Sequence, residues 1–170
     1  MKVYSYNRLT NNEHMYFRYN IAVCILEYFK ERHSDNHCAS LDKAITMLDN
    51  LENYGYMLYF VVDNNKEDIV VGFVILHIDN QYGMVNDYLV VDYMYVIPSY
   101  RNRLATRLLF TTVGKCSLDL QLDVVGCTLL GDSNNVGNVS SVGGKTIGML
   151  QIIARQDFID KYKKYMKGYK

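Results

Sequence analysis

The segment VIPSYRNRLATRLL, residues 96–109, contains the residue types of an anion-binding turn. A strand-like run stops at Pro98, and a leucine-rich helical pattern follows it. Arg101 and Arg103 bring two positive charges to the start of that pattern. Unpaired backbone N–H groups and the helix dipole favour a bound anion at such a helix start. Turns of this kind usually carry glycines that let the backbone approach a phosphate, and this segment has none.

A second group of chemically active residues is His33, His37 and Cys38, which are close enough in the chain to suggest zinc. No fourth ligand follows nearby, and His14 and His77 have no regular spacing from this group. We therefore expect a polar loop between two helices rather than a metal centre. We expect His77 to be a satisfied sheet residue.

The tyrosines Tyr88, Tyr93 and Tyr95 lie in one strand-like run and have two equally good interpretations. They can line a pocket for an acceptor, or they can simply be sheet residues, because aromatic side chains favour strands.

The C-terminal segment mixes basic and aromatic residues, a combination that can contact RNA or single-stranded DNA. The chain carries 18 basic and 18 acidic residues, so its net charge of zero disfavours nucleic acid as a partner. A solvated helix face is the favoured interpretation. The basic residues of this segment are Lys161, Lys163, Lys164, Lys167 and Lys170.

Hydrophobic periodicity predicts two helices near the N-terminus, after a short strand at residues 3–6. TNNE suits the start of the first helix, whose apolar face is formed by Met15, Tyr19, Ala22, Leu26 and Phe29. Ser40 suits the N-cap of the second helix, and Gly55 suits its C-terminal cap. The apolar positions of that second helix are Leu41, Ala44, Ile45, Leu48 and Leu51.

The period then changes to that of strands. YMLYFVVD and IVVGFVILHI predict a hairpin, and residues 88–97 predict the next strand. The helix after Pro98 has Leu104, Leu108 and Thr111 on one face, and Gly114 marks its end. Residues 124–130 predict a buried strand.

The remaining segments predict a poor short helix in VSSVGGKTIG, a strand in MLQIIARQ and a final helix in DFIDKYKKYMKGYK. The resulting order is β, α, α, β, β, β, α, β, α, β, α. This order predicts a mixed α/β domain with a central sheet.

Length and composition indicate a single domain, since 170 residues is an ordinary domain size. No apolar run approaches the roughly 18 residues that cross a bilayer, and the N-terminal segment lacks the apolar core of a signal peptide. The four cysteines form no CxxC pair, and Cys24 and Cys127 lie in apolar patterns where a thiol acts as a small hydrophobic side chain. This favours a reducing compartment. We expect a cytoplasmic chain without a membrane partner.

Three segments resemble the GNAT (Gcn5-related N-acetyltransferase) family. DIVVGFVIL is similar to the family's third strand, which often reads ivGfv. DYMYVIPSYRNRLATRLL, residues 92–109, is similar to the fourth strand and the helix after it, whose pattern is approximately L-x-V-x-P-x-Y-R-x-x-G-x-G/A. NVGNVSSVGGKTIG is similar to the family's asparagine-containing loop, short helix and closing Lys-x-x-Gly, and to a stretch in GNAT-like internal virion proteins of short-tailed phages.

The resemblance implies one GNAT-like domain over residues 1–170, with a mixed, mostly antiparallel central sheet flanked by helices and a C-terminal helix. It also implies acetyl-CoA in a gap between the strands at residues 88–97 and 124–130, with the pyrophosphate on backbone N–H groups at the helix start. The coenzyme-binding residues that it implies are Tyr95, Val96, Arg101, Asn102, Arg103, Leu104, Ala105 and Thr106.

Two departures from the family concern this site. In an ungapped alignment Leu104 and Thr106 occupy the glycine positions; alternatively, the loop is one residue short before Leu104. The position of the family's general-acid tyrosine falls on Val142 or Lys145. In both alignments of the missing glycines, side chains or a tighter turn occupy the space where the backbone should meet the phosphate.

The catalytic residues implied by the resemblance are therefore Asp92 and Ser141. Asp92 stands where the family often has a carboxylate on the fourth strand, and it would act as a base through water. Ser141, or its neighbour Ser140, would donate a proton. The acceptor would be an amine on a small molecule or a protein.

Two functions follow from these features. The first is an acetyl-CoA-dependent N-acetyltransferase that is weak or inactive because the glycines and the tyrosine are missing. The alternative is a non-catalytic GNAT-fold structural or interaction protein, such as a phage virion component in the host cytoplasm or the particle. A C-terminal helix in place of the family's last strand would leave a sheet edge open for self-association or assembly.

Overall fold

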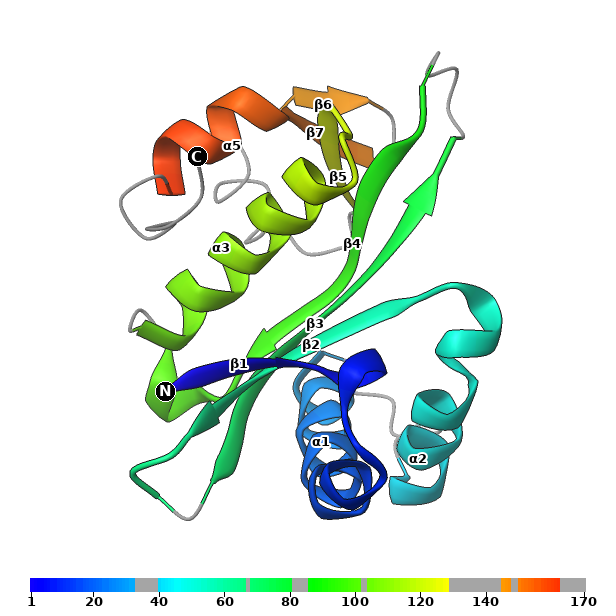
Figure 1. Ribbon diagram of the computed structural model, residues 1–170, viewed down its shortest axis with the longest axis vertical. Coiled ribbons are helices and arrows are strands. Elements are labelled where there is room, and N and C mark those ends of the chain that lie inside the picture. The colour runs from blue at the N-terminus through cyan, green and yellow to red at the C-terminus, as the bar shows by residue number, and fades with distance from the viewer. Residues whose placement is uncertain are drawn as a thin grey trace. The chain divides into compact units, whose positions relative to one another are not determined.

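The computed structural model describes residues 1–32, 40–66, 68–80, 86–101, 104–128, 145–147 and 150–162 (Figure 1). The helices in these ranges are α1 (Asn11–Arg32), α2 (Leu41–Asn50), α3 (Leu104–Asp119) and α5 (Arg155–Tyr162). The strands are β1 (Lys2–Ser5), β2 (Met57–Asp63), β3 (Ile69–Asp79), β4 (Tyr88–Val96), β5 (Val124–Thr128), β6 (Lys145–Ile147) and β7 (Leu150–Ala154).

The described strands form one seven-stranded sheet in the order β1-β2-β3-β4-β5-β7-β6. β1–β2, β5–β7 and β6–β7 are antiparallel pairs, and β4–β5 is a parallel pair. The chain between β2 and β3 and between β3 and β4 is shorter than the dozen or so residues that a parallel crossover needs, so these neighbours are antiparallel. The predicted mixed, mostly antiparallel sheet with flanking helices is confirmed.

The chain divides into two compact units. The first unit comprises Met1–Ile75 with Tyr93–Leu109, and the second unit comprises Leu76–Asp92 with Phe110–Lys170. β3, β4 and α3 each contribute residues to both units.

The core of the first unit is formed by side chains from α1, α2 and strands β2 to β4. Figure 1 shows α1 and α2 lying side by side within the first unit. Its largest fully buried side chains are Phe60, Phe73, Ile21, Ile25, Leu48, Leu58 and Ile75. Burial of such side chains stabilises the unit by about 1.5–3 kcal/mol for each one.

The buried face of α1 agrees with the predicted one only in part, since Ala22 is buried and Phe29 packs against the core as expected. Met15 and Tyr19 are 79% and 58% exposed, whereas Phe17 and Ile21 are buried. A second stripe at helical spacing, Phe17, Ile21, Cys24, Ile25 and Tyr28, packs into the core instead. This stripe is more apolar than the predicted one, and burial selects it.

The start of α1 and the ends of α2 are fixed by local hydrogen bonds. Thr10 and Glu13 form a capping box, since the Thr10 N–H donates to Glu13 and the Glu13 N–H donates to Thr10 Oγ1. Ser40 Oγ accepts from the N–H of Lys43 at 3.3 Å, which confirms the predicted N-cap. Gly55 has a φ of +73° and ends the 3-10 turn Glu52–Tyr54, so α2 itself stops earlier than predicted.

Gly72 allows β3 to approach the end of β4 closely. A Cβ atom at this position would lie 2.7 Å from the carbonyl oxygen of Tyr95 and 3.2 Å from the Cα of Val96. Both neighbours are backbone atoms, so they cannot move away without separating the strands. This contact explains why only glycine fits here.

In the second unit, β5 lies between β4 and β7, with Leu89, Val90 and Val91 opposite Val125, Gly126 and Cys127. α5 packs against α3 through stacked rings of Phe110 and Tyr162, whose centroids are 5.1 Å apart. Arg155 also bonds Asp123, through an ion pair of 2.8 Å and a backbone hydrogen bond of 2.6 Å. The predicted final helix is confirmed through Tyr162, and the residues after it lie outside the described chain.

Two predictions for the second unit are wrong. α3 does not end at Gly114 but continues to Asp119, because Val113, Cys116 and Ser117 are buried. That burial outweighs the roughly 1 kcal/mol cost of a helical glycine. Residues 145–147, within the predicted poor helix, form β6, whose pairing with β7 satisfies their backbone. The two edges of the described sheet, β1 and β6, are strands of only four and three residues.

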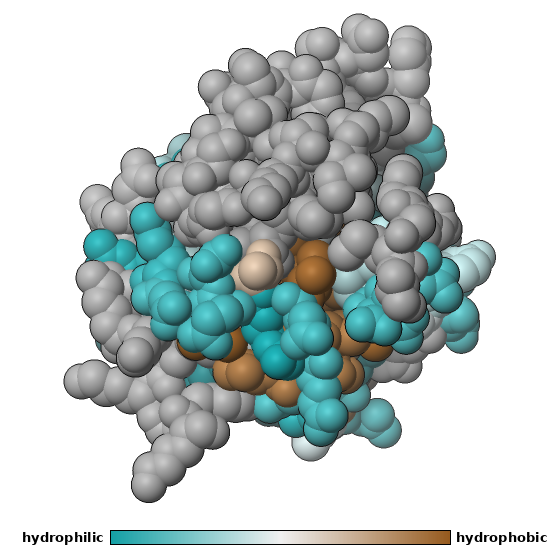
Figure 2. All heavy atoms as spheres, turned by 90° about the horizontal axis from the view of Figure 1, so that it is seen from above, coloured by the Kyte–Doolittle hydropathy of each residue, from teal (hydrophilic) through white to brown (hydrophobic). Residues whose placement is uncertain are grey.

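The surface of the described residues exposes several large apolar side chains. On the face shown in Figure 2, apolar side chains reach the surface between hydrophilic ones. Single exposed apolar side chains are normal on protein surfaces, so they do not by themselves indicate a binding site. The exposed ones are Met15, Tyr16, Tyr19, Tyr54, Ile69, Ile78, Leu104 and Leu120. No described helix is both long enough and apolar enough to span a membrane.

Candidate functional site

The turn between β4 and α3 is held by its own backbone and by β3. The N–H of Ile97 donates to the carbonyl of Val71 at 3.0 Å. Pro98 starts a 3-10 turn in which the N–H of Arg101 donates to the Pro98 carbonyl at 3.2 Å. α3 begins at Leu104 and has no acidic residue in its first turn. Its first N–H groups, rather than those of the 3-10 turn, are therefore the donors suited to an anion.

Tyr100 fastens this turn to the end of β2. Its hydroxyl donates to Asp63 Oδ2 at 2.9 Å, and both residues are buried. The hydrogen bond from Tyr100 is the main reason that the pKa of Asp63 lies below its usual range. Lys66 lies over the ring, with its ammonium 5.4 Å from the centroid. Tyr100 therefore has a structural role within the turn.

The side chain of Arg101 bonds to other residues of the first unit. Its Nη2 lies 2.5 Å from Oε2 of Glu31, and its Nε donates to the carbonyl of Val96 at 2.9 Å. Glu31 Oε2 also accepts from the hydroxyl of Tyr95 at 3.1 Å. The ion pair raises the pKa of Arg101. The arginine thus ties the turn to the end of α1, a partner that local spacing in the sequence could not indicate.

The other predicted coenzyme residues occupy different environments. Tyr95 and Val96 are buried, and Tyr95 packs within the aromatic core. Leu104 is 48% exposed, Ala105 is fully buried and Thr106 is partly buried. The structure brings together Tyr95, Val96 and Arg101 through the bonds given above. Asn102, Arg103 and the predicted catalytic residue Ser141 lie outside the described residues.

Asp92, the predicted base, is paired with a histidine. His77 Nδ1 lies 2.5 Å from Asp92 Oδ2, and His77 Nε2 lies 3.9 Å from Asp79 Oδ2. The hydroxyl of Tyr88 donates to the same Asp79 oxygen at 3.4 Å. These four residues form the His77 cluster, in which the side chains of His77, Asp79 and Asp92 are less than a quarter exposed. His77 has a polar partner within the sheet, as expected, but the sequence analysis did not identify that partner as Asp92.

The electrostatics of the His77 cluster suit proton exchange. Burial raises the pKa of Asp92, while the bond to His77 opposes that shift and the charge of Asp79 adds to it. A carboxylate with a raised pKa is a stronger base than an exposed aspartate. The sequence feature that could have indicated this arrangement is the His77–Asp79 pair, which β3 places on one face because the residues are two apart.

Metal binding has no support from the described residues. Within them, no group of three or more His, Cys, Asp or Glu side chains could hold a metal ion. The His33, His37 and Cys38 segment lies outside the described part of the chain.

Comparison with solved structures identifies the fold. An aminoglycoside 6'-acetyltransferase type Ii matches with a TM-score of 0.65 at 13% identity, covering 91% of this chain and 97% of that one. A GNAT-family acetyltransferase from Staphylococcus aureus Mu50 matches with a TM-score of 0.63 at 17% identity, covering 91% and 98%. The PaiA N-acetyltransferase from Thermoplasma acidophilum, solved with coenzyme A, matches with a TM-score of 0.58 at 11% identity, covering 91% and 99%.

Comparison by sequence identifies the family. A search of curated protein sequences gives no match. The model of the acetyltransferase (GNAT) family matches residues 25–125, which is more than half of the 170-residue chain and includes the β4–turn–α3 segment. The chain therefore belongs to the GNAT acetyltransferase family.

Proposed function

We propose that this protein is an acetyl-CoA-dependent N-acetyltransferase that acts on an amine of a small molecule or a protein. The observation that carries the proposal is the way β4 ends. The described β4–β5 pairs stop at Val91–Cys127, while β4 continues through Val96 into the turn and α3. We infer that backbone groups at this end of β4 bind an extended ligand, since the described residues of β5 do not pair with β4 beyond Val91. The family membership and the relatives solved with coenzyme A support the same function.

The residues present fit the coenzyme. Backbone groups of Tyr95 and Val96 would hold its amide-containing arm, and the first N–H groups of α3 would hold its phosphates. The first turn of α3 has no acidic side chain to repel phosphates, and Leu104 is exposed. When bound, acetyl-CoA supplies an acetyl group activated as a thioester.

The His77 cluster would accept the proton of the amine. An ammonium group cannot attack a carbonyl, so the acceptor must first lose a proton. Asp92 is the proposed base because burial raises its pKa, and His77 holds its carboxylate in place. Ser141 remains the proposed proton donor for the leaving thiolate.

We further propose that coenzyme affinity and turnover are low. Either Leu104 and Thr106 stand where the family has glycine, or the loop is one residue short before Leu104. In both cases, side chains or a tighter turn limit the approach of phosphate to the backbone. Arg101 is already bonded to Glu31, so its charge is partly neutralised before any phosphate binds. The same ion pair favours the second candidate, a GNAT-fold binding protein without catalysis.

Calorimetric titration with acetyl-CoA tests the proposal. We expect a Kd of about 10–500 μM, weaker than a well-formed site of this size would give. NADPH, which also carries an adenosine phosphate and a pyrophosphate, is the matched control and should bind at least about tenfold more weakly. Release of free coenzyme A thiol in the presence of an amine panel would then measure transfer. Absence of acetyl-CoA binding at millimolar concentration would contradict the proposal and favour the non-catalytic candidate.

A further inference from the structure

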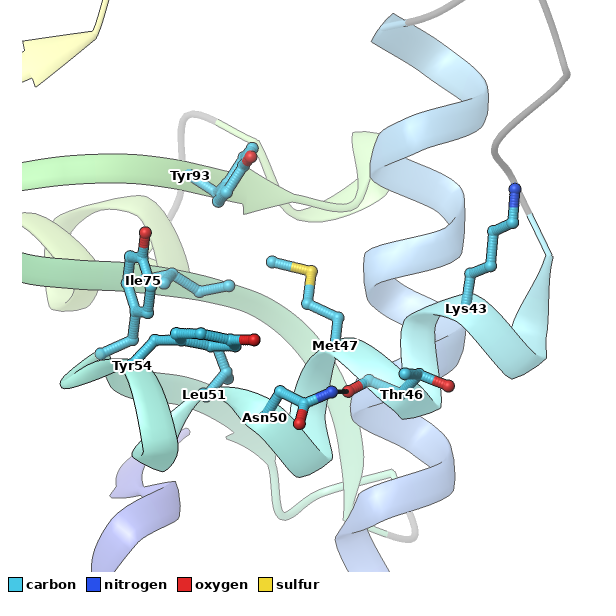
Figure 3. A pocket seen from close by; sticks show the side chains of 9 residues that line it. Lys43, Thr46, Met47, Asn50, Leu51, Tyr54, Ile75 and Tyr93 are labelled. Carbon is cyan, nitrogen blue, oxygen red and sulfur yellow. Dashed lines mark hydrogen bonds between the residues drawn. The ribbon is translucent and has the colours of Figure 1, made fainter.

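A cavity of about 340 Å³ lies in the first unit (Figure 3). It is bordered by α2, the turn that follows α2, and single residues of β3 and β4. Its lining residues are Lys43, Thr46, Met47, Asn50, Leu51, Tyr54, Tyr56, Ile75 and Tyr93. None of them belongs to the β4–α3 turn or to the His77 cluster. We name this cavity the α2 pocket.

The walls of the α2 pocket are aromatic and aliphatic. Figure 3 shows the Met47 side chain extending from α2 toward Ile75 and Tyr93. Ile75 is fully buried, so it forms a fixed floor. Tyr54 is 73% exposed and stands at the surface. Methionine adapts its shape to a bound ring and makes favourable sulfur–aromatic contacts.

The Tyr93 wall is rigid before any ligand binds. Its ring packs edge-to-face against Tyr28, with centroids 5.6 Å apart and planes at 77°. It also meets Phe29 at 6.1 Å and 65°. A ring held in this way loses little conformational entropy when a ligand packs on it. The pocket is therefore preorganised for an aromatic group.

None of the nine described residues that line the pocket is anionic. Asn50 donates to the carbonyl of Thr46 at 2.8 Å, and Thr46 Oγ1 donates to the carbonyl of Asp42 at 2.8 Å. The charged residue among the nine that line the pocket is Lys43, whose ammonium points away from Met47 in Figure 3. A ligand part with positive charge would find no carboxylate partner among these nine residues. An uncharged ring therefore suits this lining better than a cationic group.

We propose that the α2 pocket binds the aromatic ring of an arylalkylamine, that is, a ring joined by a short alkyl chain to a primary amine. The volume is near the lower end of ligand pockets, which suits one ring and a short chain better than an oligosaccharide. Aromatic walls favour offset or edge-to-face contact with the ring, and the amine remains outside the apolar part. That this amine is the acetyl acceptor rests on the function proposed above.

Binding to the full-length wild-type protein without acetyl-CoA tests the pocket by itself. The probes are 2-phenylethylamine, n-butylamine, which lacks the ring, and spermidine, a polycation. We expect 2-phenylethylamine to bind at least about tenfold more tightly than either of the others in calorimetry. Equal affinity for n-butylamine would show that no ring is recognised and would overturn the inference. Tighter binding of spermidine would overturn it as well.

Variants locate the binding to this pocket. Tyr54→Ala and Met47→Ala should each weaken 2-phenylethylamine binding by about fivefold or more, since each removes one wall. The matched control is Tyr19→Ala, because Tyr19 is 58% exposed on α1 and does not line the pocket. Tyr54 is exposed, so its truncation leaves the core intact. No loss in either variant, or an equal loss in Tyr19→Ala, would overturn the assignment.

A charge substitution gives a second readout that does not depend on the walls. Lys43→Glu should increase the affinity for spermidine while leaving the preference for a ring over n-butylamine. If this variant left spermidine binding unchanged, the charge argument would be wrong.

The outcome is separable from that of the proposed function. If 2-phenylethylamine binds as expected and acetyl-CoA does not bind, the pocket is supported and acetyl transfer is contradicted. If acetyl-CoA binds and 2-phenylethylamine does not, the pocket inference fails and the proposed function stands.

Discussion

Glu31 near the end of α1 and Arg101 in the turn before α3 form an ion pair across a sequence separation of 70 residues. Both side chains are partly exposed, at 38% and 41%. Arg101 also bonds the carbonyl of Val96, so the pair connects the first helix with the end of β4. The positive charge of Arg101, which could bind an anion, is therefore already paired with the carboxylate of Glu31.

Arg101→Ala should weaken acetyl-CoA binding by about two- to fivefold, the size expected of a partly exposed charge. The loss should be larger at about 50 mM than at about 500 mM salt, because salt screens exposed charges. Arg103→Ala should have the same effect. Calorimetry at the two salt concentrations measures both. Unchanged affinity in both variants would show that the turn does not hold phosphate.

Glu31→Gln supplies the matched control for this prediction. It keeps the size and one hydrogen-bond acceptor of Glu31 but removes the negative charge next to Arg101. Acetyl-CoA affinity should rise in this variant. A fall in affinity would mean that the ion pair is needed to shape the site.

A glycine inserted between Arg103 and Leu104 should increase acetyl-CoA affinity by about tenfold, or roughly 1.4 kcal/mol. The insertion restores the RxxGLA spacing and lets backbone N–H groups approach the pyrophosphate. Turnover should rise less than affinity, because the proton donor is unchanged. An alanine inserted at the same place is the control and should give a smaller gain. If wild-type protein already binds tightly and acetylates amines rapidly, the idea of an altered, weakened site is wrong.

Asp92→Asn should change the dependence of stability on pH. Burial raises the pKa of Asp92 in the folded protein. The folded state therefore holds this proton more tightly than the unfolded state, and the stability it confers is lost as pH rises through the folded pKa. Asparagine cannot ionise, so its stability relative to wild type should improve between about pH 4 and about pH 7. Thermal unfolding of both proteins at the two pH values measures this.

The same variant should lower acetyl transfer by about a hundredfold if Asp92 accepts the amine proton. His77→Gln tests the positioning part, since it removes the partner of Asp92 but leaves the carboxylate. Its activity loss should be smaller and should come with a shifted pH profile. An Asp92→Asn variant with wild-type activity at every pH would exclude Asp92 as the base.

Tyr100→Phe should destabilise the first unit more at about pH 7 than at about pH 3. The Tyr100 hydrogen bond holds the pKa of Asp63 below its usual range. A lowered pKa confers stability above the unfolded pKa, near 4, and this stability is lost as pH falls through the folded value. The melting temperatures of the two proteins should therefore converge in acid. A constant difference would mean that the bond contributes equally to the protonated state.

Gly72→Ala should destabilise the protein by about 2 kcal/mol or more, because the new Cβ meets backbone at 2.7 Å. Gly55→Ala meets no atom within 4 Å, and its expected cost, about 1 kcal/mol, comes from the positive φ alone. Asparagine distinguishes the two causes, since it tolerates a positive φ. Gly55→Asn should recover stability relative to Gly55→Ala, whereas Gly72→Asn should be worse than Gly72→Ala. Chemical denaturation of the four variants measures the order.

Local sequence patterns predicted a helix or strand well where contacts between residues close together in the chain determine its position. Thr10–Glu13 and Ser40 are caps within a single turn, so their residue types identified the helix starts. The strands β2, β3 and β4 have continuous β-branched and aromatic runs. The α1 face was predicted only in part, because two apolar stripes compete on that helix and only packing on the sheet selects Phe17 over Met15.

The candidate site was less predictable, because it depends on residues far apart in the chain. Arg101 could be named from the turn pattern and Asp92 from the resemblance to the family's fourth strand. Their partners Glu31 and His77 could not be identified in this way. A partner 70 residues away follows from how α1 packs on the sheet, which no local spacing encodes. The α3 end at Gly114 failed for the same reason, since buried neighbours decided it.

Cys24 and Cys116 are buried cysteines that are not part of a disulfide, and one lies in each compact unit. Burial raises the pKa of Cys24, so its reactive thiolate is scarce while the helix is packed. Each thiol can therefore react with an alkylating reagent only when its surroundings open. Peptide mass spectrometry can follow the labelling of each cysteine separately, so the two labelling rates would report local unfolding around each cysteine. Equal rates would show that both units open in one cooperative event, and unequal rates would show which half of the protein opens first.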